Sequence, residues 1–261
     1  MYTFNFRRAS SLEDAQQIHQ SSSDAVYVAG GMTLIPSLKL RLANPDDVVD
    51  LSQIDGLGAI SSADGAVSVG AMARHCEVAA TTDIPALAAL ANRIGDGQVR
   101  NRGTIGGSLA NNDPAADYPA AVLGLGATIH TNSRTIAGDD FFVDLFETAL
   151  GDGEIITRVD FPIPKRAAYA KFANQASKYA VVGVMVAETD SGVRVGVTGA
   201  GACAFRLTSF EDALSANMSA SALDGIDVDS SDFNSDLHAS AAYRGSLVTV
   251  MAKQAVEQLT A

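Results

Sequence analysis

GTIGGSLANNDPAAD, residues 103–117, is the stretch on which the interpretation of this chain depends. Its adjacent glycines, Gly106 and Gly107, stand between small and hydroxyl residues and leave the backbone without Cβ atoms at that point. Backbone N–H groups can then come close to phosphate oxygens without the help of a lysine. The stretch therefore predicts a phosphate-cradling loop. The alternative is a tight turn or β-bulge that binds nothing.

A second Gly-Gly pair lies earlier, in Ala29-Gly30-Gly31-Met32-Thr33. Residues 25–28 are apolar and predict a short strand, and residues 34–40 predict a helix whose early Pro36 suits a first turn. The pair is thus expected at a helix N-terminus, where anions bind. Neither pair has the Rossmann or P-loop spacing. Two such loops in one domain predict a single diphosphate held from two sides.

Composition limits the classes of function. The chain has 261 residues and 47% hydrophobic content, enough to bury a sizeable core. No apolar run approaches the roughly 20 residues that span a bilayer, and the first residues lack an apolar signal-peptide segment. We therefore expect a cytoplasmic protein. The net charge of −12 argues against a nucleic-acid partner.

The residues that usually bind metals are few and scattered. Cys76 and Cys203 are the only cysteines, whereas an iron–sulfur cluster needs four thiolates, so this chain cannot hold one alone. The histidines are His19, His75, His130 and His238. We expect each of them to be an ordinary core or surface residue. The sequence predicts no metal site and no catalytic side chain.

The remaining patterns predict strands and helices in order. Ser10 is expected to cap a short helix, with Glu13 as its capping-box partner. The strand at 25–28, the helix at 34–40 and a strand at 48–51 predict a small parallel unit with its ligand at the carboxyl ends of the strands. Further strands are expected at 66–70, 127–130, 154–161, 169–172, 180–187 and 193–198, and further helices at 84–94, 119–125, 208–214 and 238–259.

Several local features refine this outline. Pro162 and Pro164 end the strand at 154–161 and mark a predicted domain boundary. The turn residues at 190–192 predict an antiparallel hairpin, and the Asp- and Ser-rich segment 224–236 predicts a solvated loop. The last helix offers one apolar face, made of Leu247, Val250, Met251 and Val256. Arg100 and Arg102 precede the central loop, where they either face phosphate charge or lie on the surface.

Four segments resemble the FAD-binding medium subunit of molybdenum hydroxylases, a family that includes xanthine dehydrogenase, aerobic carbon monoxide dehydrogenase and nicotine dehydrogenase. They are residues 29–36, 99–109, 113–117 and 239–244. The resemblance implies an α+β fold that begins with a two-part FAD-binding domain of the vanillyl-alcohol-oxidase (PCMH) type at 1–163, with subdomains of about 1–55 and 56–163. A C-terminal domain at 164–261 would then combine a three-stranded antiparallel sheet with a helical bundle.

The resemblance also implies the FAD site. Asp117 would hydrogen-bond the cofactor, Ile155 and Ile156 would line the flavin, and Tyr179 would lie where the C-terminal domain approaches the isoalloxazine. The diphosphate would lie against Ala29, Gly30, Gly31, Met32, Thr33, Thr104, Ile105, Gly106, Gly107 and Ser108. No residue receives a catalytic role, because in this family the isoalloxazine does the chemistry.

Three residues depart from the family pattern. Met32 removes one side-chain donor from the first loop. Ala173 stands where the family often has a basic cluster, and Lys178 stands where it often has an acidic residue. Charge near the ring alters the stability of the reduced flavin, so these two changes bear on its redox tuning and on its electron acceptor.

The implied function is electron transfer within a complex. Molybdenum–pterin would reside in a large partner subunit and two [2Fe–2S] clusters in a small one, as a dimer of heterotrimers. This chain would carry FAD between those clusters and NAD, a quinone, a cytochrome or oxygen. Two alternatives stay open at this point. One is a stand-alone flavin oxidoreductase of the same fold, and the other is a non-catalytic module that binds a diphosphate ligand.

Overall fold

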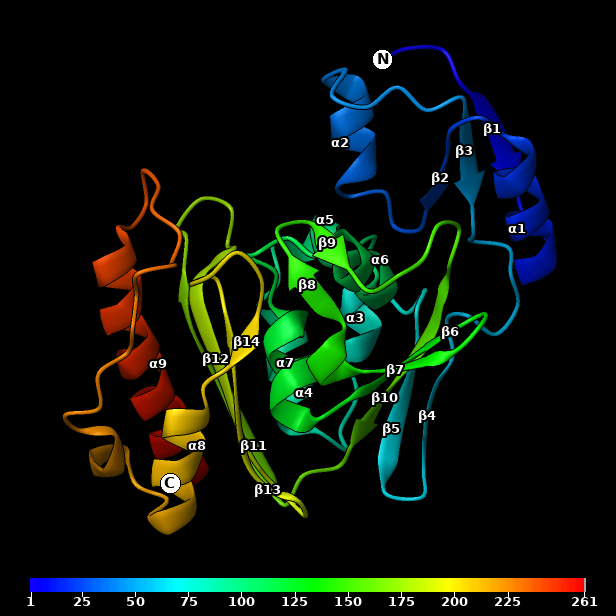
Figure 1. Cartoon of the computed structure of the whole chain (residues 1–261). Coiled ribbons are helices and arrows are strands. Elements are labelled where there is room, and N and C mark those ends of the chain that lie inside the picture. The colour runs from blue at the N-terminus through cyan, green and yellow to red at the C-terminus, as the bar shows by residue number, and fades with distance from the viewer. Residues whose placement is uncertain (261) are drawn as a thin grey trace.

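Three larger sheets follow one another along the chain, and a fourth, two-stranded sheet is a separate hairpin, as the computed structural model of residues 1–260 shows (Figure 1). The first sheet is parallel, in the order β1-β3-β2. Its strands are β1 (Asn5–Arg8), β2 (Ala25–Val28) and β3 (Asp47–Asp50), and its helices are α1 (Leu12–Ser21) and α2 (Leu34–Lys39). The parallel strand–helix–strand unit expected from the sequence is therefore confirmed.

The cap of α1 differs from the prediction by one residue. The N-cap is Ser11, whose hydroxyl accepts from the Asp14 amide at 3.1 Å, while the Asp14 carboxylate accepts from the Ser10 amide at 2.8 Å. The predicted pair of Ser10 and Glu13 was therefore wrong. Two adjacent serines each fit the motif, and the packing of Leu12 and Ala15 into the core beneath α1 selects the second.

The second sheet is antiparallel throughout and is formed by the middle of the chain, in the order β4-β5-β10-β6-β7. Its strands are β4 (Ile60–Ala63), β5 (Ala66–Gly70), β6 (Thr128–Thr131), β7 (Thr135–Ala137) and β10 (Ile156–Pro162). A separate hairpin pairs β8 (Phe142–Asp144) with β9 (Glu147–Thr148). The helices are α3 (His75–Val78), α4 (Pro85–Asn92), α5 (Gly97–Arg100), α6 (Ile105–Asn111), α7 (Tyr118–Leu125) and the 3-10 turn η1 (Gly138–Asp140).

The third sheet is antiparallel, with β11 (Arg166–Ala173), β12 (Ala180–Thr189), β13 (Gly192–Thr198) and the two-residue edge strand β14 (Phe205–Arg206). The three long strands expected from the family resemblance are present, and the hairpin at 190–192 is confirmed. The helices that follow are α8 (Thr208–Ala216), η2 (Ala220–Leu223) and α9 (Ala241–Thr260).

Strand β12 is buried on both faces, and its residues alternate between two cores. Val184 and Val186 pack toward α8 and α9, whereas Met185 packs toward the core that contains α7. Helix α9 buries a stripe through Val248 and Ala255. Val250, predicted on that face, is 45% exposed, because helical geometry places it almost opposite Val248.

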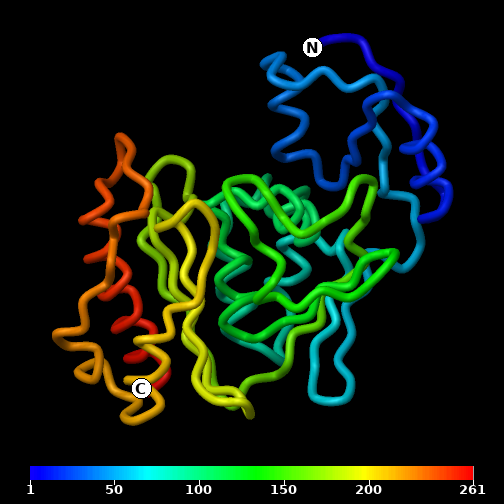
Figure 2. Tube along the Cα trace, in the orientation of Figure 1, coloured from blue at the N-terminus to red at the C-terminus, as the bar shows by residue number. Residues whose placement is uncertain are grey.

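The first sheet and its two helices lie to one side of the second sheet, and the third sheet lies on another side of it (Figure 1). Figure 2 shows the blue N-terminal region set above the green middle region, with α9 at the far side of the third sheet. Among the helices of residues 1–260, none combines the length and the apolarity needed to cross a bilayer.

Candidate functional site

A cleft of about 710 Å³ lies where the first sheet meets the middle region. Four segments contribute to its wall, and they come from distant parts of the sequence. They are residues 26–34, 103–111, 154–156 and 177–179. Twelve of the fourteen site residues expected from the sequence lie in those segments and line the cleft, and Asp117 lines it as well. Ile105 is the exception, since it is buried in the core behind the wall.

The first glycine motif follows β2. Gly31 has φ +74°, a conformation that favours glycine, and a Cβ on Gly30 would lie 2.1 Å from the carbonyl oxygen of Arg102. The two glycine motifs therefore touch through their main chains. Within residues 1–260, no protein acceptor takes the amide hydrogens of residues 30–33. This motif thus offers unused backbone donors at the cleft.

The second motif is built differently. Gly106 and Gly107 lie in the first turn of helix α6, which the sequence analysis did not predict, and Thr104 is its N-cap. The Gly106 amide donates to the Ala71 carbonyl at 2.8 Å, and the Gly107 amide donates to the Thr104 hydroxyl at 3.2 Å. These donors are already in use, so the predicted phosphate cradle is not a set of free amides here.

The two glycines of the second motif also face different neighbours. A Cβ on Gly106 would lie 2.6 Å from the Cβ of Ala71, so Gly106 allows close packing within the protein. A Cβ on Gly107 would meet only the Thr104 hydroxyl at 3.0 Å and the Ala29 methyl at 3.7 Å. The rest of the space beside Gly107 belongs to the cleft, where a ligand can approach the backbone.

Asp117 precedes α7 and takes part in a buried ion pair. Lys171 on β11 donates from Nζ to Oδ1 at 2.8 Å and to Oδ2 at 3.0 Å, and the Tyr169 hydroxyl donates to Oδ1 at 2.7 Å. Burial raises the pKa of Asp117, and the Lys171 charge opposes that rise. Burial likewise lowers the pKa of Lys171. Oδ1 accepts two hydrogen bonds, whereas Oδ2 accepts one and can accept another from a ligand hydroxyl.

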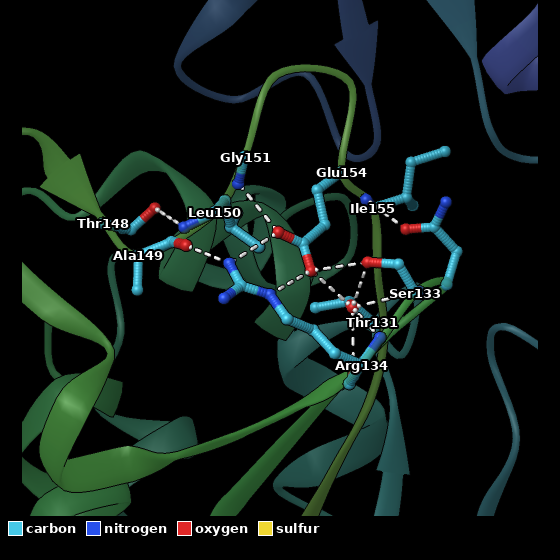
Figure 3. A network of polar contacts seen from close by, with 10 residues as sticks. Thr131, Ser133, Arg134, Thr148, Ala149, Leu150, Gly151, Glu154 and Ile155 are labelled. Carbon is cyan, nitrogen blue, oxygen red and sulfur yellow. Dashed lines mark hydrogen bonds and ion pairs between the residues drawn. The ribbon is translucent and has the colours of Figure 1, made fainter.

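Leu150 and residues 154–156 line another part of the cleft, and Glu154 anchors this segment (Figure 3). Its Oε1 accepts from Thr131, Ser133 and Arg134 at 2.6, 2.9 and 3.0 Å, and its Oε2 accepts from the Gly151 amide at 2.7 Å. The bond from Arg134 is the main cause that lowers the Glu154 pKa to about 2. The network fixes the turn before Ile155 and Ile156, whose buried side chains line the cleft.

Tyr179 closes the cleft from the C-terminal side. It ends a turn in which the Asn174 amide donates to the Tyr179 carbonyl at 2.8 Å and Lys178 has φ +64°. The Tyr179 side chain is 45% exposed at the rim. Tyr179 and Lys178 both line the cleft, whereas Ala173 does not.

The two arginines before the second motif do not line the cleft. Arg100 donates from Nη1 to the carbonyls of Ile94 and Gly95 at 3.0 and 3.1 Å, so it closes a turn. Arg102 is exposed, and its contribution near the cleft is its carbonyl oxygen against Gly30. Arg102 thus lies on the surface, whereas Arg100 is half-buried, and neither side chain lines the cleft.

Three polar residues of the site were not predicted from the sequence, either as residues that face a ligand or as residues that support the site. They are His75, Glu154 and Lys171. His75 is 5% exposed and lies against the start of the second motif, yet a lone histidine carries no signal in a single sequence. Within residues 1–260, no group of three or more His, Cys, Asp or Glu side chains is placed to hold a metal ion.

Comparison with known proteins places this cleft in context. Residues 2–164 match the family profile described as FAD binding domain in molybdopterin dehydrogenase. The nicotine 6-hydroxylase medium subunit of Paenarthrobacter nicotinovorans is 34% identical over 264 residues, which cover 94% of this chain and 93% of that subunit. The carbon monoxide dehydrogenase medium chain of Afipia carboxidovorans is 34% identical, over 73% of this chain and 70% of that chain.

Solved structures agree over nearly the whole length. A chain of the cyanide-inactivated Cu,Mo-CO dehydrogenase superposes with a TM-score of 0.90 at 30% identity, covering 99% of this chain and 98% of that chain. A chain of quinoline 2-oxidoreductase from Pseudomonas putida 86 superposes with a TM-score of 0.87 at 29% identity, covering 98% and 96%.

Proposed function

This chain belongs to the family of FAD binding domains in molybdopterin dehydrogenases, and from that premise we propose that it is the FAD-carrying electron-transfer subunit of a molybdenum hydroxylase complex. It would take electrons from the [2Fe–2S] clusters of a partner subunit and pass them to an external acceptor. The observation that carries the proposal is the cleft in which both glycine motifs meet.

The cleft fits FAD in size and in chemistry. Its volume of about 710 Å³ lies within the usual range for cofactor sites. The unused amides of residues 30–33 would donate to the diphosphate, and Gly107 would leave room for it. Asp117 Oδ2 would accept from a cofactor hydroxyl, and Ile155, Ile156 and Tyr179 supply an apolar wall for a flat ring.

The residues of this chain would position FAD, shield it from solvent and fix the charges around it. FAD, when bound, supplies a ring system that accepts and releases electrons singly or in pairs. Glu154 keeps the apolar segment at 155–156 in place, and the pair of Asp117 and Lys171 ties the middle region to the third sheet. No side chain of the cleft is assigned as a general acid, a base or a nucleophile.

The proposed partners follow from the names of the relatives. Those proteins are called medium chains or medium subunits, which implies larger and smaller companions in the same assemblies. We extend this to a large molybdenum–pterin subunit and a small [2Fe–2S] subunit, assembled as a dimer of heterotrimers in the cytoplasm. A domain boundary at residues 163 and 164 belongs to the same proposal, and the family profile also ends at residue 164.

The test is to purify the full chain and to measure what stays bound. We expect a yellow protein whose flavin absorbance survives desalting, with one FAD per chain released by denaturation. Tagged chain produced in its native host is expected to bring down polypeptides that contain iron and molybdenum. Colourless protein that binds only a sugar nucleotide would contradict the proposal, and a flavoprotein that oxidises a small molecule without partners would favour the stand-alone enzyme.

A further inference from the structure

His75 lies at the wall of the cleft, beside the start of the second glycine motif. It is the first residue of α3, and its amide donates to the Gly103 carbonyl at 3.0 Å. A Cβ on Gly103 would lie 2.5 Å from the His75 Nε2 atom, so the imidazole packs directly against this glycine. A Cβ on Gly30, in the first motif, would in turn lie 2.8 Å from the Gly103 Cα. His75 therefore stands where the two motifs meet.

The hydrogen bonds around His75 identify which ring nitrogen carries the proton. The fully buried Tyr118 has its hydroxyl 3.2 Å from His75 Nδ1, and no other protein partner reaches that hydroxyl within residues 1–260. A hydroxyl has one hydrogen to donate, and a buried donor without an acceptor is costly. Tyr118 therefore donates to Nδ1, which places the imidazole proton on Nε2.

The imidazole is neutral at physiological pH. Burial lowers the His75 pKa to about 4, and the positive charge of Arg100 acts in the same direction. The Nε2–H group thus stays a neutral donor with a defined direction. In the part of the chain that the structure describes, no protein acceptor receives it. His75 is 5% exposed and lines the cleft, so its unpaired Nε2–H group is a donor that an acceptor on a bound ligand can satisfy.

We propose that His75 is a cofactor-binding residue that donates a hydrogen bond from Nε2 to a phosphate oxygen of the bound dinucleotide. The inference rests on the proposed FAD site and adds a side-chain donor to the backbone donors of residues 30–33. It also explains Tyr118, whose hydroxyl fixes the tautomer. Gly103 has to lack a side chain because the imidazole occupies that space.

Two substitutions separate this role from a packing role. His75→Gln keeps an acceptor for Tyr118 and a donor at the Nε2 position, whereas His75→Leu fills the space without either. We expect His75→Leu to weaken FAD binding about 10-fold or more and His75→Gln to stay within about 3-fold of the wild type. ADP, which carries the diphosphate without the flavin, is expected to lose affinity by a similar factor. His130→Gln, the same change at a histidine outside the cleft lining, serves as the control.

The tautomer is tested directly by nitrogen-15 NMR of the full chain before FAD is added. We expect an unprotonated Nδ1 and a protonated Nε2 at His75, with the Nε2 proton resonance moving when FAD binds. Protonation at Nδ1 would overturn the inference, and so would wild-type affinity for FAD or for ADP in a folded His75→Leu variant. Wild-type protein that binds no FAD at all would instead contradict the proposed function.

Discussion

The two glycine motifs are alike in sequence but have different roles in the cleft. In the first motif, Gly31 adopts φ +74°, and none of the described residues 1–260 accepts a hydrogen bond from the amides of residues 30–33. In the second, the glycines lie in a helical turn whose amides are satisfied by Ala71 and by the Thr104 hydroxyl. The first motif is therefore suited to donate hydrogen bonds to a ligand, and the second to leave room for one.

Each motif also contains one glycine whose missing side chain is required for packing within the protein. Gly30 lets the first motif touch Arg102, and Gly106 lets α6 touch Ala71. A Gly-Gly pair thus combines a packing requirement with a ligand requirement. Substitutions at the two kinds of glycine should have different consequences, which gives a way to test the comparison.

The largest expected effect follows from Gly107→Val. The branched side chain would occupy the cleft beside Thr104, so we expect a folded protein whose FAD affinity falls by about 100-fold or more, that is by roughly 3 kcal/mol. Absorbance after desalting and a fluorescence titration with FAD measure this loss. Gly30→Val should behave differently and destabilise the fold itself, because its Cβ would lie 2.1 Å from the Arg102 carbonyl oxygen.

The control for Gly107→Val is Gly58→Val. Gly58 is exposed and a Cβ there would meet no atom within 4 Å, so neither folding nor FAD binding is expected to change. Full FAD occupancy in Gly107→Val would mean that the cofactor does not border the second motif.

A smaller effect distinguishes the threonines of the two motifs. The Thr104 hydroxyl accepts from the Gly107 amide, whereas Thr33 makes no side-chain cap to α2. Thr104→Ala is therefore expected to lower the free energy of unfolding by about 1 kcal/mol, and Thr33→Ala by less than about 0.5 kcal/mol. Urea unfolding without FAD measures both. Equal losses would show that the two motifs are capped alike.

The last comparison concerns the wall that neither motif supplies, and its effect on stability depends on pH. The folded chain holds the Glu154 pKa at about 2, below the model-compound value of 4.5. Glu154 therefore adds stability at pH above about 4.5, and that contribution is lost as the pH falls toward about 2. Glu154→Gln should melt below the wild type at about pH 6, with a difference that narrows by about pH 3. Glu257→Gln, on the exposed side of α9, should show no such trend.

A large part of the fold could be predicted from the sequence alone. Apolar runs bounded by turn residues identified β2, β5 and β12, because local periodicity reports burial directly. The turn at 190–192 identified the hairpin of β12 and β13 for the same kind of reason. The glycine motifs could also be recognised, because the residue type alone shows where the backbone lacks a Cβ atom.

Other features depended on tertiary contacts. The sequence could not choose between Ser10 and Ser11 as the cap of α1, because both satisfy the local rule and only packing against the core decides. Nor could it predict α6, a helix of seven residues with two glycines, which forms where Thr104 caps it and Ala71 accepts from it. Short helices with poor helical propensity owe their stability to such contacts.

By itself, then, the sequence determined the family, the order of most of the longer strands and helices and the two glycine motifs, because these depend on residue type and on spacing along the chain. Only the tertiary structure decided which amides remain free, which glycine faces the cleft, and that Lys171 and His75 meet residues 54 and 43 positions away. Such pairings join groups that are distant in sequence, and no local pattern encodes them. Burial then sets their charge and tautomer, since the removal of water makes each buried donor depend on a specific acceptor.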